Sequence, residues 1–141
     1  MTPRLFRGLI LAHVAALSLS VALSVFDHGV PPALLDAQLE SVPGWLLDES
    51  ALVLSLLLVA VAAVTTGYLG LFFFKPWGRA VSLWTTIIGC LLTPALGPSL
   101  SGGLSAAFYD AANLLWGAVL ALAYVSPVAQ RFRGASPRQA L

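Results

Sequence analysis

The sequence predicts an all-α integral membrane protein in which four transmembrane helices form one bundle in up-down-up-down order. Two observations predict this class. Hydrophobic residues make up 59% of the 141 residues and charged residues only 9%, whereas soluble domains carry about 25% charged residues. Four apolar runs also approach the roughly 20 residues that a helix needs to cross a bilayer. Together they exclude a water-soluble globule.

The predicted spans, within a single domain over residues 1–141, are 8–26, 51–74, 80–96 and 104–125. The third span is the shortest, and Pro94 weakens its last turn because proline lacks an amide hydrogen. The outer connection over 27–49 contains Pro31 and Pro32 ahead of mixed leucines and acids, which predicts a short amphipathic helix. Residues 126–141 are expected to form a cytoplasmic tail.

The charged residues are sorted by sign along the chain. The basic residues form three clusters, which are Arg4 with Arg7, Lys75 with Arg79, and Arg131 with Arg133 and Arg138. All acidic residues except Asp110 lie in the connection over 27–49. Because cytoplasmic loops carry an excess of positive charge, this pattern predicts cytoplasmic N and C termini. Small size and the preference for arginine over lysine favour a bacterial inner membrane.

Residues at the ends of the apolar runs are expected to anchor the helices in the two membrane interfaces. Lys75, Trp77 and Arg79 mark the cytoplasmic interface between the second and third spans, and Trp45 marks the outer interface. These residues are topology markers, and they carry no catalytic chemistry.

The first apolar run has a second interpretation. Basic residues, an apolar stretch and the triplet Ala22-Leu23-Ser24, with small residues at its first and third positions, also describe a cleavable signal peptide. The charge pattern fits both interpretations, because cleavage would leave the other spans in the same orientation. The packing pattern of the run favours a retained helix.

Small residues recur at helical spacing in the spans, which predicts faces where helix backbones approach closely in lipid. The residues singled out for packing are Gly8, Ala12 and Ala16 in the first span, Thr86 and Gly89 in the third, and Gly117 in the fourth. This pattern predicts a compact bundle, or contact with a second copy or another membrane protein.

Asp110 is the one acidic residue inside an apolar run. An ionisable side chain within a span is costly unless it is paired, so by default it marks a functional site. Asn113, Thr93, Ser20 and Ser55 are expected near its depth as hydrogen-bond donors. The alternative is a packing role, with Asp110 held by those donors or hydrated near the outer surface.

His13 is expected to belong to a second polar cluster nearer the cytoplasm. Thr65, Thr66 and Tyr68 lie at a similar depth in the second span. A neutral imidazole hydrogen-bonded to Tyr68 or to a threonine is the favoured interpretation.

The absence of reactive motifs predicts no enzymatic activity, no metal and no cofactor. Cys90 is the single cysteine, so dithiol redox chemistry has no pair to use. The two histidines, His13 and His28, are not placed to ligate haem from facing spans. The sequence has no basic stripe with interleaved aromatic residues, so it does not predict nucleic-acid binding.

The predicted function is that of a small non-enzymatic accessory or interaction subunit, possibly a homo-oligomer, whose partner meets the outer loop or the small-residue stripes. The first alternative is a small ion- or proton-coupled transporter or channel with Asp110 as its protonatable site. A weaker alternative is an immunity-type protein that blocks a membrane toxin.

Overall fold

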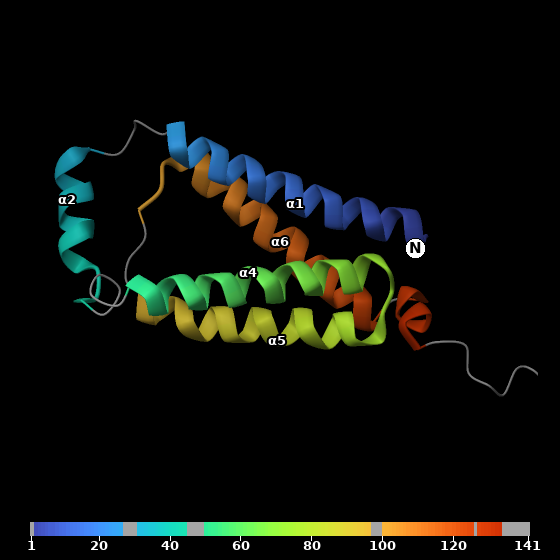
Figure 1. Cartoon of the computed structure of the whole chain (residues 1–141). Helices are drawn as coiled ribbons and strands as arrows, with labels where there is room; N and C mark the ends of the chain where they lie inside the picture. The colour runs from blue at the N-terminus through green and yellow to red at the C-terminus, as the bar shows by residue number, and fades with distance from the viewer. Residues whose placement is uncertain (1, 27–30, 45–49, 97–99, 126, 134–141) are drawn as a thin grey trace, which may run out of the picture.

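The computed structural model describes residues 2–26, 31–44, 50–96, 100–125 and 127–133. Its helices are α1 (Pro3–Phe26), α2 (Pro32–Ser41), α4 (Ser50–Phe72), α5 (Pro76–Leu92), the 3-10 helix η1 (Thr93–Leu96), α6 (Gly103–Val125) and the 3-10 helix η2 (Pro127–Arg133). These described residues contain no β-strand, and four of the helical segments are long and apolar enough to cross a membrane. The fold is therefore that of a multi-pass, all-helical membrane protein (Figure 1).

Two spans begin earlier than hydropathy alone predicts. Helix α1 begins at Pro3 and α5 at Pro76, because proline suits the first turn, where its missing amide hydrogen costs no helical bond. Helix α5 gives way to η1 at Thr93, one residue before Pro94, since proline cannot donate to the α-helical ladder. Basic residues therefore lie within the first turns of both helices.

The four long helices associate as two pairs, α1 with α6 and α4 with α5 (Figure 1). The pairs converge at the end that carries the N-terminus and diverge toward the end that carries α2. We call the end with the N-terminus the basic end, because α1 begins there and the turn between α4 and α5 places Lys75 there. The other is called the α2 end.

Helices α1 and α6 are matched in layers two turns apart. The matched residues are Phe6 with Val119, His13 with Ala112, and Ser20 with Ser105. In the second layer and in the third, a hydrogen bond of 2.8 Å links α1 to α6. Both helices thus repeat their contact positions every seventh residue, which is the period of left-handed coiled coils.

Helices α4 and α5 approach each other through glycine. An ideal Cβ added at Gly70 would lie 2.5 Å from the Cα of Gly78, and one added at Gly67 would lie 2.7 Å from Ser82 Oγ. Real Cβ atoms essentially never come within 3.0 Å of another heavy atom. Close backbone approach of this kind holds helices together where lipid provides no hydrophobic driving force.

The turn after α4 is a Schellman motif with phenylalanine in the left-handed position that glycine usually takes. The amide of Lys75 donates to Gly70 O at 2.8 Å, and the amide of Phe74 donates to Leu71 O at 3.1 Å. Phe74 has a φ of 55°, which a bulky residue rarely adopts. Its ring lies 5.6 and 5.3 Å from two core phenylalanine rings, and this packing offsets the backbone strain.

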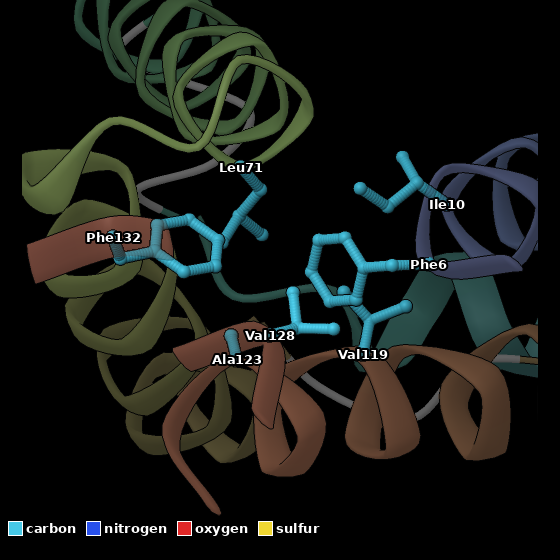
Figure 2. Close-up of a cluster of buried hydrophobic side chains, with 7 residues drawn as sticks. All are labelled: Phe6, Ile10, Leu71, Val119, Ala123, Val128 and Phe132. Atoms are coloured by element: carbon cyan, nitrogen blue, oxygen red, sulfur yellow. The ribbon is translucent and has the colours of Figure 1, made fainter. Parts of the chain in front are cut away.

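A cluster of buried apolar side chains fills the basic end, where α1, α4, α6 and η2 meet (Figure 2). Its members are Phe6, Ile10, Leu71, Val119, Ala123, Val128 and Phe132. In Figure 2, Phe6 points from α1 toward Val128 of η2, and Phe132 lies beside Leu71 of α4. The short helix η2 therefore closes this end of the bundle.

Ser82 holds a buried hydroxyl at the contact between α4 and α5. Its Oγ has no hydrogen-bond partner within the described chain, and the side chain is 2% exposed. Because Ser82→Ala removes an unsatisfied polar atom and keeps the small volume, we expect the free energy of unfolding to stay constant or to rise by up to about 1 kcal/mol. The measurement is unfolding by sodium dodecyl sulfate in mixed micelles, followed by far-UV circular dichroism. A clear loss of stability would contradict this account of Ser82.

Several of the small residues singled out for packing meet no other helix within the described chain. A Cβ added at Gly8, Gly89 or Gly117 would meet nothing within 4 Å, Ala12 is exposed and Ala16 is half-buried. The expectation that Gly8, Gly89 and Gly117 pack the bundle internally is wrong for the described chain. Because lipid tails are as apolar as the side chains of a membrane helix, a small residue can face either lipid or a neighbouring helix.

Candidate functional site

One side chain from each of the four long helices contributes to a polar and aromatic cluster in the membrane-spanning region. Its members are His13 of α1, Tyr68 of α4, Thr86 of α5 and Trp116 of α6. We refer to them as the four-helix cluster. It joins the α1–α6 pair to the α4–α5 pair on the α2 side of the apolar core.

His13 is 4% exposed, and both of its ring nitrogens have partners. Nδ1 lies 2.8 Å from Ala112 O, and it must carry the hydrogen because a carbonyl oxygen only accepts. In the neutral imidazole Nε2 is then an acceptor, so it receives the hydrogen of the Tyr68 hydroxyl at 2.6 Å. This contact fixes both the tautomer and the ring orientation of His13.

Trp116 packs against both partners of that hydrogen bond. Its ring stacks on His13 with centroids 5.0 Å apart and meets Tyr68 edge-on at 4.9 Å. Trp116 Nε1 donates to Thr86 Oγ1 at 2.8 Å, and the Thr86 hydroxyl donates to Ser82 O at 2.8 Å. Each donor of the cluster thus has an acceptor, which is the condition under which a buried polar network stabilises a fold.

The structure brings together part of the inner polar cluster expected from the sequence. His13 and Tyr68 are hydrogen-bonded, whereas Thr65 and Thr66 are exposed and take no part. Thr86, expected as a packing residue, is the acceptor for Trp116. Trp116 was not singled out, although a tryptophan in mid-span needs a partner for its N–H, and that requirement is the signal that could have found it.

The outer polar residues do not converge. Asp110, Asn113, Thr93 and Ser55 are exposed, and only Ser20 is buried. The hydroxyls of Thr93 and Ser55 donate to carbonyls of their own helices, Gly89 O at 2.9 Å and Leu52 O at 2.7 Å.

Helical geometry explains why Asp110 and its expected neighbours stay apart. Helix α6 turns Ser105 and Ala112 toward α1, where Ser105 O accepts from Ser20. Asp110 lies on another side of the same helix, since neighbouring positions on a face are three or four residues apart. The expected group of donors around Asp110 is therefore not formed within the described chain.

The interface residues lie at the basic end. Lys75 is exposed in the turn before α5, Trp77 is 46% exposed, and Arg79 is half-buried. The Arg79 guanidinium lies over the rings of Tyr124 and Phe132. The predicted anchor Trp45 lies outside the described residues.

Comparisons with known protein families, with curated proteins and with solved structures give no match. Among the residues that the structure describes, no group of three or more histidine, cysteine, aspartate or glutamate side chains could hold a metal ion. The functional proposal therefore rests on the geometry of the chain alone.

Proposed function

We propose that this chain is a non-enzymatic interaction subunit of a bacterial inner membrane, and that its α6 helix docks a transmembrane helix of a partner protein or of a second copy. The observation that carries this proposal is Asp110. Its carboxyl group is exposed on α6 and has no hydrogen-bond or ion-pair partner among the described residues. Docking would supply that partner.

The position of Asp110 makes isolation in lipid costly. It lies seven residues after Gly103, where α6 begins, or roughly 10 Å along the helix axis. A carboxylate at that depth needs a hydrogen-bond donor, a cation or water. A polar or basic side chain on the docked helix would provide one of the first two.

The surroundings of Asp110 suit a closely packed helix. Asn113 and Gly117 lie one and two turns farther along α6, and both are exposed. A Cβ at Gly117 would meet nothing within 4 Å, so its backbone is accessible to another helix. Asp110, Asn113 and Gly117 form what we call the α6 docking face, which combines a small residue with two polar groups that can bond across helices.

The proposed orientation follows the charge pattern. We propose up-down-up-down spans with the basic end in the cytoplasm, because positive charge is retained there. Lipid would then surround the exposed leucines of α4, and the leucines of α2 would lie on the outer membrane surface.

Photo-crosslinking from Leu114 tests the docking proposal. Leu114 is 77% exposed and lies one turn from Asp110, whereas Leu58 of α4 is 62% exposed and serves as the lipid-facing control. A photoreactive residue at position 114 is expected to yield a protein adduct in cells, and one at position 58 lipid adducts. Lipid adducts alone at position 114 would count against the proposal.

Two substitutions locate the contact on the α6 docking face. Asp110→Leu and Gly117→Leu are each expected to lower the yield of the protein adduct about tenfold, because a polar or small-residue contact between membrane helices is worth ~1–2 kcal/mol. Gly89→Leu is the matched control, since Gly89 is equally open but lies on α5. Equal losses in all three variants would contradict a specific α6 contact.

Ion transport through Asp110 is the alternative that the same residue allows. Proton and monovalent-ion flux through purified protein in liposomes distinguishes it from docking. We expect no flux from the native chain, because the described polar residues do not converge on Asp110. Flux that disappears in Asp110→Asn would overturn the docking proposal, since that variant keeps the shape but cannot ionise.

A further inference from the structure

Basic side chains gather at the basic end, and no described carboxylate lies there to neutralise them. Arg4, Lys75 and Arg131 are exposed there, and Arg7 and Arg79 are half-buried. No ion pair links a described arginine or lysine to a described carboxylate, and the acids of α2 lie at the other end of the bundle. The two half-buried arginines differ from the rest because both are held in place.

Arg7 is fixed against the end of α4. Its Nε donates to Phe72 O at 3.2 Å, and its guanidinium carbon lies 4.9 and 5.3 Å from the ring centroids of Phe72 and Phe74. A guanidinium has five N–H donors, and this contact uses one. The remaining donors lie on a planar group whose orientation the two rings restrict.

Arg79 is fixed in the same way against the end of α6. Its Nη1 donates to Ala123 O at 3.3 Å, and its guanidinium carbon lies 5.2 and 5.1 Å from the ring centroids of Tyr124 and Phe132. Its Nε is buried and has no described hydrogen-bond partner. Each arginine thus stabilises the carbonyl end of a neighbouring helix. Because Arg7 Nε is bonded and Arg79 Nε is buried, the donors left for a ligand are those of the terminal nitrogens Nη1 and Nη2.

One aromatic cluster separates the two guanidinium groups. Phe74, under Arg7, and Phe132, under Arg79, are in ring contact with centroids 5.3 Å apart. Trp77, Phe73 and Tyr124 at the same end are 46%, 60% and 42% exposed. Exposed aromatic rings of this kind gather at the headgroup level of a bilayer, which is the level of lipid phosphates.

We propose that Arg7 and Arg79 bind the phosphate groups of anionic phospholipids at the basic end. A fixed guanidinium can donate two parallel hydrogen bonds to phosphate oxygens, and both arginines have donors left for this purpose. The planar groups lose little freedom on binding because the rings already orient them. Phosphatidylglycerol or a lipid with two phosphates satisfies this chemistry, whereas a zwitterionic headgroup adds a competing ammonium.

The test compares the thermal stability of the purified full-length chain in detergent with added phosphatidylglycerol and with added phosphatidylcholine. The quantity read is the difference in Tm between the two lipids, taken within each variant, so that a general loss of stability cancels. We expect phosphatidylglycerol to give the higher Tm for the native chain. Arg7→Gln and Arg79→Gln are each expected to reduce this difference to less than half.

Three controls keep this proposal falsifiable. Arg131→Gln removes the same charge from an exposed position and is expected to keep the difference. Arg7→Lys keeps the charge but loses the planar fork, so it is expected to retain only part of the difference. Equal loss in Arg131→Gln would reduce the effect to net charge and overturn the site, and an equal rise with inorganic phosphate alone would overturn its assignment to lipid. If a glutamine variant does not fold, native mass spectrometry of Arg7→Lys gives the same comparison as the number of phosphatidylglycerol molecules retained.

Discussion

Gly78→Ala is expected to lower the free energy of unfolding by about 3 kcal/mol, the upper end of the usual cost of overpacking. A Cβ at Gly78 would collide with the backbone carbonyl carbon of Gly70 and would lie 2.6 Å from its Cα and 2.7 Å from Leu71 N. Backbone atoms cannot rotate away as a flexible side chain can, so α4 and α5 would have to separate. The measurement is unfolding by sodium dodecyl sulfate in mixed micelles, followed by far-UV circular dichroism.

Gly89→Ala is the matched control for this prediction. Gly89 lies on the same helix and has nothing within 4 Å of an added Cβ. Because alanine favours helix over glycine by about 1 kcal/mol, the stability of this variant is expected to stay equal or to rise. Similar losses for both substitutions would show that the glycine contact between α4 and α5 is not what stabilises the hairpin.

His13→Ala is expected to lower the free energy of unfolding by about 3 kcal/mol, since it removes two hydrogen bonds of ~1 kcal/mol each and a buried ring. The losses are the bonds to Ala112 O and to the Tyr68 hydroxyl, together with the stacked contact on Trp116. These contacts join the two helix pairs, so the pairs would separate more easily. The same detergent unfolding experiment measures the change.

Two further variants distinguish the hydrogen bonds of His13 from its bulk. Tyr68→Phe removes one hydroxyl and is expected to cost only about 1 kcal/mol. His13→Gln supplies an amide that can donate to Ala112 O and accept from Tyr68, so it is expected to recover part of the loss. A His13→Ala variant as stable as the native chain would contradict the structural role of the four-helix cluster.

Hydropathy predicted the spans because a helix in lipid must satisfy its own backbone hydrogen bonds, which requires a minimum apolar length. The four candidate spans of the structure lie where the sequence predicted them. Helix starts were missed by a few residues, since Pro3 and Pro76 fit a first turn although arginines follow them. The membrane orientation stays a prediction, which rests on the charge pattern of the connections.

The contact faces could not be read from the sequence. In water an amphipathic pattern marks the buried side of a helix, but in lipid both sides are apolar. Large residues such as Phe6 and Leu71 occupy the core, whereas Gly8 and Gly117 face outward. The spacing of small residues therefore does not tell which side of a helix faces another helix and which side faces lipid.

The candidate sites were predicted unequally for the same reason. Tyr68 was expected beside His13 because few polar groups share that depth, and the structure places them together. Asp110 was expected among hydroxyls, but those hydroxyls bond to carbonyls of their own helices or lie on other faces. Depth follows from residue number, whereas rotation about the helix axis depends on packing that one sequence does not specify.

The pairing of α1 with α6 constrains the order in which the helices can assemble in the membrane. Helices α4 and α5 are joined by a tight turn, so this hairpin has both halves as soon as α5 has been synthesised. Helix α1 is made first, yet its partner is the last of the four long helices. Until α6 enters the membrane, His13 and Ser20 have no Ala112 or Ser105 carbonyl to bond. We therefore expect the α4–α5 hairpin, in the middle of the sequence, to assemble first. Helix α1, although synthesised first, is expected to reach its final packing last.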